Sequence, residues 1–365
     1  MKRVIVSVTN DLVTDQRVYK ICNTLLKMNY NLLLIGRKLP NSKEINRPYK
    51  VHRFNLLFNK GFLFYAEYNL RLFFKLFFLK KDILLSNDLD TLLPNFIISK
   101  VFRKKLVYDS HELFTEVPEL IDKPFVRNFW LKIEKFIVPE IKNCTTVSNS
   151  IANYYNTKYN TDFKLIRNFP YKTTTQKTDN FPFETSNKKI ILYQGAINKG
   201  RGLELMIETM QFINNTIFII IGKGDLELKL KEKITNLNVS EKVKFISEIT
   251  PKKLKKLTPL ASLGISLEED LGLNYRFALP NKLFDYINAK IPVLVSDLPE
   301  MKQIILTYNV GEIINSREPK QLVNQIEKLL KKETSYFEKK LEIAKNELIW
   351  ENEENKLIEI FENLN

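Results

Sequence analysis

Short apolar runs alternate with amphipathic segments along the first half of the chain. The runs that predict strands are 3–8, 31–36, 82–86, 105–108 and 144–147. Near-continuous apolar runs of this length are typical of parallel strands buried on both faces of a sheet. The segment from Asp15 to Met28 has the spacing of a helix between two such strands. Repeated strand–helix units of this kind predict a doubly wound α/β sheet.

The alternation stops after residue 170 and resumes at Lys188. The intervening segment 171–187 is rich in Thr, Lys, Asn and Pro, a composition typical of a linker. A second series of apolar runs predicts strands at 188–195, 216–222, 243–246, 263–267 and 292–296. Helices are expected at 202–212 and from Pro280 onward, so this half predicts a second sheet of the same kind.

A chain of 365 residues is long for a single α/β core, and two domains are expected. We predict a Rossmann-like domain at 1–170, a linker at 171–187 and a second Rossmann-like domain at 188–345. Residues 346–365 carry apolar side chains at roughly helical spacing. They predict an amphipathic helix that packs back toward the N-terminal domain.

The charge and cysteine content narrow the functional classes. The net charge of +15 predicts attraction to nucleic acid, anionic lipid or phosphorylated small molecules. Two cysteines cannot form a disulfide framework, which favours a reducing compartment. The N-terminus enters a strand at once, so no signal peptide is expected and a cytoplasmic location is predicted. The lysines are scattered along the chain, which argues against nucleic acid as the partner.

The most apolar region, 56–81, is too often interrupted by charge to span a membrane. Glu67, Arg71 and Lys75 are four residues apart and fall on one helical face. One interpretation is a mostly buried helix with a single wetted stripe. The other is a basic, aromatic surface that rests on an anionic membrane leaflet, which would make the protein peripheral on the inner face of the cytoplasmic membrane.

Ligands of open α/β sheets bind beyond the carboxyl ends of the strands, so the loops there are the candidate sites. The loop before the strand at 292–296 places Asn281 and Lys282 at a helix N-terminus. Free N–H groups beside a cation suit a phosphate. Asp285 lies one turn further along, where its carboxylate could accept hydrogen bonds from a ribose diol. This combination predicts a nucleotide-sugar site.

Three segments resemble one known family. They are NDLVTDQRVYKICNTLLK from Asn10, YDSHE at 108–112 and ALPNKLFDYINAKIPVLVSDLPEM at 278–301. Together they resemble the retaining glycosyltransferases of family GT4 (glycosyl transferases group 1), and in particular a bacterial envelope-polysaccharide subgroup. The resemblance implies the GT-B fold, in which two Rossmann-like domains face each other across a cleft, the first binding the acceptor and the second the nucleotide sugar.

The resemblance also implies the reaction. A sugar would move from a UDP or GDP donor to a cell-envelope glycan or lipid-linked acceptor, with retention of configuration and without a metal or other cofactor. The departing phosphate oxygen would deprotonate the acceptor, so no general base is needed.

The same resemblance implies roles for individual residues. The implied catalytic residues are His111, Arg201 and Lys282. The implied donor-binding residues are Gly195, Gly202, Gly222, Glu248, Glu269, Gly272, Leu273, Asn281 and Asp285. On the acceptor side are Asn10, Asp15 and Arg17, although capping of a helix by Asp15 and an ion pair for Arg17 are equally open. A neutral imidazole at His111 would hydrogen-bond a sugar hydroxyl of the donor or polarise the reacting centre.

The chain departs from the family pattern in one place. The family usually has two glutamates with seven residues between them, whereas fifteen residues separate Glu269 from Asp285 here. This spacing predicts an insertion within NYRFALPNK. Glu268 or the backbone amides of 272–274 could then replace Glu269 as the first donor-binding group.

Three other interpretations remain open from the residues. One is a sugar-nucleotide epimerase of the same architecture, which would need an acid/base pair at the sugar. Another is a non-catalytic scaffold with this fold, and the third is a nucleic-acid-binding protein. The only Asp-x-Asp sequence, Asp88-Leu89-Asp90, is expected to be part of a loop, and no metal site is predicted.

Overall fold

The computed structural model describes residues 1–13, 15–172, 179–185, 188–332 and 334–364. The chain forms two compact units, and the C-terminal segment returns to the first of them. Unit 1 contains 1–168 together with 350–365, and unit 2 contains 169–349. The predicted linker lies partly outside the described residues.

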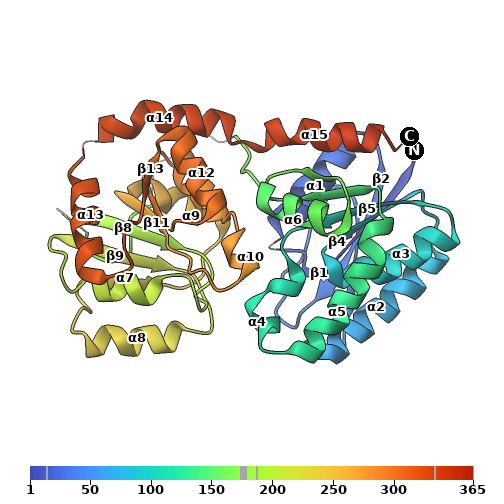
Figure 1. Ribbon diagram of the computed structural model, residues 1–365, viewed down its shortest axis with the longest axis horizontal. Coiled ribbons are helices and arrows are strands. Elements are labelled where there is room, and N and C mark those ends of the chain that lie inside the picture. Colours follow the sequence, from blue (N-terminus) through green and yellow to red (C-terminus); the bar gives the residue numbers. More distant parts are fainter. Residues whose placement is uncertain (14, 173–178, 186–187, 333, 365) are drawn as a thin grey trace. The chain divides into compact units, whose positions relative to one another are not determined.

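Unit 1 is built on a parallel sheet of seven strands in the order β3-β2-β1-β4-β5-β6-β7 (Figure 1). The strands are β1 (Arg3–Asp11), β2 (Asn31–Lys38), β3 (Lys50–Asn55), β4 (Ile83–Asn87), β5 (Lys105–Ser110), β6 (Asn143–Thr146) and β7 (Phe163–Leu165). The five predicted strands of this half are present. The sequence pattern missed β3 and β7, which form the two edges of the sheet.

Helices cover both faces of this sheet (Figure 1). They are α1 (Gln16–Lys27), α2 (Gly61–Phe78), α3 (Leu92–Val101), α4 (Pro118–Ile121), α5 (Pro124–Ile137), α6 (Asn149–Tyr159) and α15 (Trp350–Glu362), with short 3₁₀ turns at Leu89–Thr91, Phe114–Glu116 and Val138–Glu140. Helices α2, α3 and α5 lie side by side on one face, and α1 packs with α15 on the other. Buried apolar side chains on both faces explain the continuous apolar runs of the strands.

Helix α15 is held on α1 by buried side chains. Trp350 and Phe361 are fully buried, and the indole Nε1 of Trp350 donates to Thr24 Oγ1 (3.3 Å). Glu354 accepts hydrogen bonds from Thr24 (2.7 Å) and Lys27 (2.8 Å). The predicted helix at 346–365 is in fact divided, because α14 (Thr334–Glu347) ends before α15 begins.

Unit 2 contains a parallel sheet of six strands in the order β10-β9-β8-β11-β12-β13. The strands are β8 (Lys189–Gln194), β9 (Thr216–Ile221), β10 (Val243–Ile246), β11 (Leu263–Ser266), β12 (Val293–Val295) and β13 (Gly311–Ile313). The five predicted strands of this half are present, and only the three-residue edge strand β13 was missed. The predicted fold class, two doubly wound parallel sheets, is therefore confirmed.

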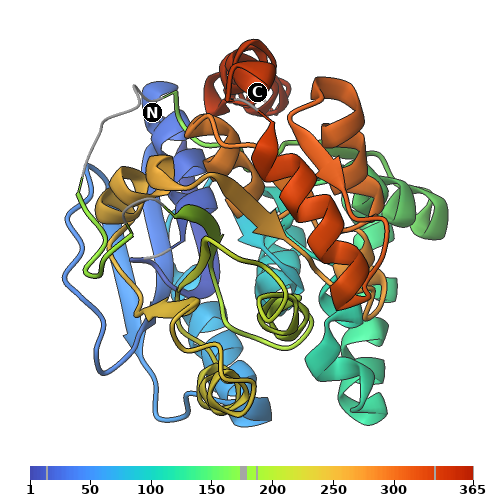
Figure 2. The ribbon, with the colours of Figure 1, turned by 90° about the vertical axis from the view of Figure 1, so that its left-hand side faces the viewer.

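The helices of unit 2 form a layer on each face of the sheet (Figure 2). They are α7 (Leu203–Thr209), α8 (Glu227–Asn236), α9 (Pro251–Leu257), α10 (Leu273–Arg276), α11 (Asn281–Asn288), α12 (Pro299–Tyr308), α13 (Pro319–Lys331) and α14, with a 3₁₀ turn at Thr258–Leu260. Helices α7, α8 and α13 lie together on one side, and α11, α12 and α14 lie together on the other (Figure 1). Phe169, which precedes the predicted linker, and Phe181, which lies within it, are buried in the core of this unit.

No helix in the described part of the chain combines the length and the apolar character needed to cross a bilayer.

Candidate active site

Each sheet has a point where the strand order reverses. In unit 1 this point lies between β1 and β4, and in unit 2 it lies between β8 and β11. Loops from neighbouring strands diverge there and leave room for a ligand at the carboxyl edge of the sheet. One cluster of candidate site residues lies at each of these points: Arg201 and Lys282 in unit 2, and Arg17 and His111 in unit 1.

In unit 2, a buried carboxylate lies beside two cations. Glu268 follows β11 and is fully buried, and the Nζ of Lys282 donates to its Oε1 (2.5 Å). Arg201 Nη1 lies 3.7 Å from the same oxygen, and Ser266 Oγ donates to Oε2 (2.7 Å). Burial alone would raise the pKa of Glu268, but Lys282, Arg201 and Ser266 together hold that pKa below its usual value. The cluster therefore has two cations for one anion.

Lys282 is placed by the start of α11. It is the second residue of that helix, and its Nζ lies 4.4 Å from the ring centroid of Tyr193, which belongs to β8. Gly195 follows β8 with φ of +136°, a backbone conformation that favours glycine. The predicted phosphate-binding elements, a helix N-terminus and a lysine, are therefore present together at this edge of the sheet.

Arg201 lies in the loop between β8 and α7. Its Nε is buried and has no hydrogen-bond partner among the described residues. Buried donors are nearly always satisfied in folded proteins, so an orphan donor of a cation indicates a site for an acceptor. Its guanidinium also lies 4.9 Å from the ring centroid of Tyr275.

The predicted insertion explains how this loop is held. Part of it forms the short helix α10, from which Tyr275 donates a hydrogen bond to the carbonyl of Lys199 (3.0 Å). Gly202, which precedes α7, has φ of +73°, and a Cβ there would lie 2.2 Å from the carbonyl oxygen of Leu267. Only glycine allows this close approach of the Arg201 loop to the strand that leads to Glu268.

Asp285 lies one turn into α11, beside the end of β8. Its Oδ2 accepts a hydrogen bond from Gln194 Nε2 (3.0 Å), and Gln194 Oε1 in turn accepts from Thr258 Oγ1 (2.9 Å). This chain of hydrogen bonds fixes the Asp285 carboxylate near the positive cluster. Lys282 pairs with Glu268 rather than serving only as a helix-surface partner of Asp285.

Other predicted donor residues do not join this cluster. Glu269 is half-exposed and lies 4.0 Å from Arg317, so Glu268 and not Glu269 is the carboxylate beside the two cations. Glu248 is exposed in the loop after β10, and Asn281 is exposed at the start of α11. The structure places Gly272 and Leu273 at the start of α10. Gly222 allows β9 to approach Gly195, because a Cβ there would lie 1.9 Å from the Gly195 carbonyl oxygen.

Arg317 is a residue that the sequence interpretation missed. Its guanidinium donates to the carbonyls of Leu267 (2.8 Å) and Glu268 (3.2 Å) and to Ser296 Oγ (3.1 Å). Arg317 therefore fixes the backbone that carries Glu268. Arg317 lies 49 residues after Glu268 in the chain, and no local sequence pattern marks it.

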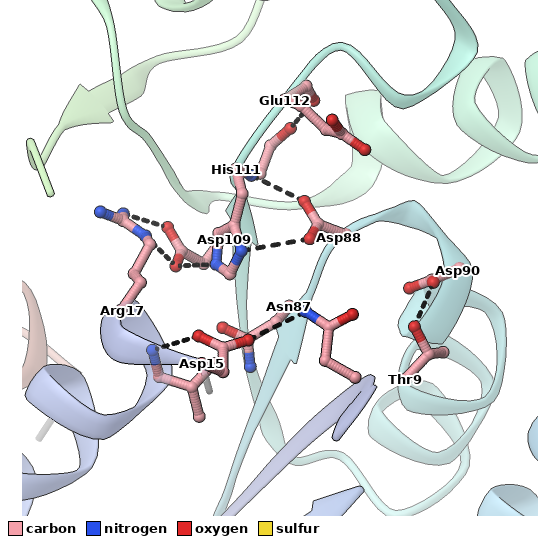
Figure 3. A network of polar contacts seen from close by, with 12 residues as sticks. Thr9, Asp15, Arg17, Asn87, Asp88, Asp90, Asp109, His111 and Glu112 are labelled. Carbon is pink, nitrogen blue, oxygen red and sulfur yellow. Dashed lines mark hydrogen bonds and ion pairs between the residues drawn. The ribbon is translucent and has the colours of Figure 1, made fainter. Parts of the chain in front are cut away.

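In unit 1, the ends of β4 and β5 bring together Arg17, Asp88, Asp109 and His111 (Figure 3). Arg17 Nε and Nη2 donate to the two oxygens of Asp109 (2.8 and 2.6 Å), and Nη1 donates to the carbonyl of Ile166 (2.7 Å). Thr145 also donates to Asp109 (2.6 Å). Arg17 and Asp109 are both buried, so this bidentate ion pair is part of the core beneath the sheet edge.

His111 is held between two carboxylates. Its Nε2 lies 2.9 Å from Asp109 Oδ2 and its Nδ1 lies 3.2 Å from Asp88 Oδ2, while its backbone N–H donates to Asp88 (2.7 Å). Burial opposes the charged form, but Asp88 and Asp109 raise the pKa of His111 well above 6.5. Carboxylates against both ring nitrogens therefore favour the imidazolium form, whereas the resemblance implied a neutral imidazole. The same arrangement keeps the pKa of Asp109 well below its usual value despite burial, mainly through Arg17 and His111.

Asp15, held by Asn10, caps the N-terminus of α1. Asp15 Oδ1 accepts from the backbone N–H of Val18 (3.0 Å), and its Oδ2 accepts from Asn10 Nδ2 (3.0 Å). Asp15 is thus the N-cap of α1, and Arg17 is engaged in the ion pair with Asp109. Of the predicted acceptor-side residues, Asn10 is the one whose side chain is exposed.

Asp90 is a buried acid near the His111 cluster (Figure 3). Thr9 Oγ1 donates to its Oδ2 (2.5 Å), and its Oδ1 is buried without a hydrogen-bond partner among the described residues. Burial, and secondarily the carboxylate of Asp88, raise its pKa to about 8. The two aspartates of the Asp-x-Asp sequence have separate partners, because Asp88 binds His111 and Asp90 binds Thr9. Among the described residues, no group of three or more His, Cys, Asp or Glu is arranged to hold a metal.

We expect Asp90 to make the protein less stable as the pH rises. The unfolded chain releases this proton near pH 3.8, whereas the folded protein keeps it up to about 8. Between these values the unfolded state binds fewer protons, so the free energy of unfolding falls with increasing pH. In Asp90→Asn, which mimics the protonated acid, this fall should shrink by more than about 1 kcal/mol between pH 5 and pH 8. Urea unfolding of both proteins at the two pH values measures it, and parallel pH profiles would contradict the assignment.

Known proteins show the same architecture. Residues 175–348 match the family described as Glycosyl transferases group 1. Sucrose-phosphate synthase from Thermosynechococcus elongatus has a TM-score of 0.80 at 13% identity, covering 100% of this chain and 99% of that one. The Anabaena protein Alr3699/HepE in complex with UDP-glucose has a TM-score of 0.74 at 13% identity, covering 100% of both chains.

A curated relative matches a shorter region. Chitobiosyldiphosphodolichol beta-mannosyltransferase of Candida albicans is 25% identical over 137 residues, which is 35% of this chain and 29% of that protein. The match therefore spans less than a third of the length of this relative.

The two parallel sheets and the similarity to these solved structures show that the chain has the two-domain GT-B fold. The predicted resemblance to the glycosyl transferases group 1 is confirmed by the match of residues 175–348 to that family.

Proposed function

We propose that this protein is a glycosyltransferase that takes a sugar from a nucleotide-diphosphate sugar. The observation that carries the proposal is the cluster of Arg201, Lys282 and Glu268 at the switch point of unit 2, where Arg201 keeps a buried, unpartnered donor. Two cations beside one carboxylate leave positive charge for a diphosphate. The Anabaena structure similar to this chain holds UDP-glucose, which supports the choice of donor class.

In the proposed reaction, Arg201 and Lys282 bind the diphosphate and neutralise the charge that develops on it as the sugar–phosphate bond breaks. Fixed cations in a partly dry site are an effective means of such stabilisation. The N-terminus of α11 adds its backbone N–H groups. Glu268 keeps both cations in place, and Asp285 accepts hydrogen bonds from the ribose diol.

We propose retention of configuration, with the departing phosphate oxygen taking the proton of the acceptor hydroxyl. This scheme requires neither a general base nor a metal from the protein. The acceptor is a cell-envelope glycan or a lipid-linked intermediate, and the donor base is uracil or guanine. The family that residues 175–348 match supports the reaction class, while the donor sugar and the acceptor are open to experiment.

His111 takes an electrostatic role in this proposal. Both of its ring nitrogens are engaged by Asp88 and Asp109, so the ring supplies positive charge at the carboxyl edge of the first sheet. His111→Gln should reduce turnover without reducing the affinity for the free nucleotide.

The donor site is tested by thermal unfolding with UDP, GDP and CMP in the absence of added metal. Ligand at about 100 times its Kd stabilises the folded state by about 2.7 kcal/mol. We expect one diphosphate to raise the melting temperature, and Arg201→Ala to weaken its binding at least about tenfold. Lys302→Ala is the matched control, because it removes an exposed cation of the same unit that pairs with Asp297 (2.9 Å).

The remaining interpretations predict other results. A sugar-nucleotide epimerase would convert the donor sugar without an acceptor, which product analysis by chromatography detects. A non-catalytic scaffold would show no turnover with any donor and acceptor pair. Absence of binding to every nucleotide would overturn the proposed donor site.

A further inference from the structure

Exposed apolar side chains are concentrated on one part of unit 1. Of the twenty large hydrophobic side chains that are exposed in the described part of the chain, fourteen lie between residues 57 and 136. Single exposed hydrophobic residues are normal, but a concentration of this kind indicates an interaction surface.

Helix α2 is apolar on both of its faces. Its buried face consists of Phe64, Tyr68, Leu72 and Leu76, which are spaced by four residues. The exposed side chains of the same helix are Phe62, Leu63, Leu70, Phe74, Phe77 and Phe78. A helix that packs on a sheet with one face normally has polar residues on the other. The outer face of α2 therefore exposes apolar side chains that no other part of the described chain covers.

The neighbouring helices continue this surface (Figure 1). The rings of Phe62 on α2 and Phe129 on α5 are 6.2 Å apart, and those of Phe96 on α3 and Phe136 on α5 are 6.3 Å apart. Phe125, at the start of α5, is 88% exposed. We call the exposed apolar side chains of 57–78, 97–101 and 121–136 the aromatic face.

The charges around the aromatic face are mostly positive. Between residues 57 and 140, eight lysines and arginines but only three acidic residues are exposed. On α5, Lys132 and Lys135 lie between Phe129 and Phe136. Lys60 and Lys80 lie directly before and after the apolar part of α2. The aromatic face thus presents apolar rings together with cations.

We propose that the aromatic face docks on the surface of an anionic lipid bilayer. Phenylalanine side chains would enter the boundary between headgroups and acyl chains, while the lysines would contact anionic headgroups. A protein partner is disfavoured because the cores of protein interfaces are depleted in lysine. The inference rests on unit 1 alone, whereas the proposed donor site lies in unit 2, so either can fail without the other.

The test is flotation of the full-length protein with vesicles of phosphatidylcholine alone or mixed with phosphatidylglycerol. We expect binding to the mixed vesicles that weakens at high salt. The triple variant Phe62→Ser, Phe78→Ser, Phe125→Ser should bind at least roughly tenfold more weakly. Its matched control is Leu228→Ser with Leu306→Ser, which removes two exposed apolar side chains of unit 2 (77% and 63% exposed) and should bind like the wild type.

A second variant tests the electrostatic part separately. Lys132→Gln with Lys135→Gln should weaken binding to the anionic vesicles by roughly tenfold or more and leave binding to neutral vesicles unchanged. Thermal unfolding and nucleotide binding of every variant should match the wild type, which shows that the fold is intact. Equal flotation of wild type and both variants would overturn the proposal. So would a dimer, seen by light scattering, that the triple variant abolishes, because a second copy would then cover the face.

Discussion

Lys282→Ala is expected to remove nucleotide binding and to destabilise unit 2. Its ammonium is the closest cation to the buried carboxylate of Glu268, and it is itself almost fully buried. Loss of one partner leaves an uncompensated charge in the interior, which costs about 3–5 kcal/mol. We expect a loss of about 3 kcal/mol in the free energy of unfolding, the low end of that range, because Arg201 remains 3.7 Å from Glu268.

A double variant separates stability from function at this site. In Lys282→Ala with Glu268→Gln, the buried group is neutral, so most of the lost stability should return. Binding of the diphosphate should stay at least about tenfold weaker than in the wild type, because the cation is still absent. Urea unfolding and calorimetric titration measure the two effects. Recovery of nucleotide binding in the double variant would show that Lys282 acts only as a structural partner of Glu268.

Asp109→Asn is expected to have the largest effect in unit 1. It leaves the buried guanidinium of Arg17 without its anion and removes one of the two carboxylates that face His111. Breaking a buried pair by removing one partner costs about 3–5 kcal/mol. The pKa of His111, measured by NMR titration, should fall toward its ordinary value, because only Asp88 still faces the ring.

The pH dependence of the same variant has a defined sign. The folded pKa of His111 is raised, so its stabilising contribution is complete below pH 6.5 and is lost as the pH rises through the folded pKa. The difference in free energy of unfolding between wild type and Asp109→Asn should therefore decrease above pH 6.5. A double-mutant cycle with Arg17→Met isolates the ion pair, and a coupling energy below about 0.5 kcal/mol would contradict its importance.

The sequence predicted the central strands and the apolar edge strand β10, and it missed the three other edge strands. The edge strands β3, β7 and β13 are short or carry polar residues such as Lys50, His52 and Arg53. Edge strands pair on one side only and need fewer apolar residues, so their pattern is weak. Helix α2 was open to two interpretations because its buried and exposed faces are both apolar, and no sequence pattern distinguishes them.

Lys282 and Asp285 were expected from one helix N-terminus, and Arg201 only from the family resemblance. The structure brings Arg201 and Lys282 together beside Glu268. Successive residues leaving a strand point in opposite directions, so Glu268 lies beside the two cations while Glu269 is half-exposed near Arg317. Asp88 and Asp109 were missed as partners of His111, and the Arg17–Asp109 pair joins residues 92 positions apart. Such contacts depend on the order of strands, which spacing along the chain does not reveal.

Because α15 packs on unit 1, unit 2 cannot be removed or exchanged with a single cut in the chain. Unit 2 is inserted into unit 1 between residues 168 and 350. The two chain segments of unit 1 at these borders are in contact, because the backbone N–H of Arg167 donates to Glu353 (2.9 Å). Cutting the chain after residue 168 would strip α1 of Trp350 and Phe361. A chimera that exchanges unit 2 must therefore splice at both borders, and a short bridge from 168 to 350 gives unit 1 as one continuous polypeptide.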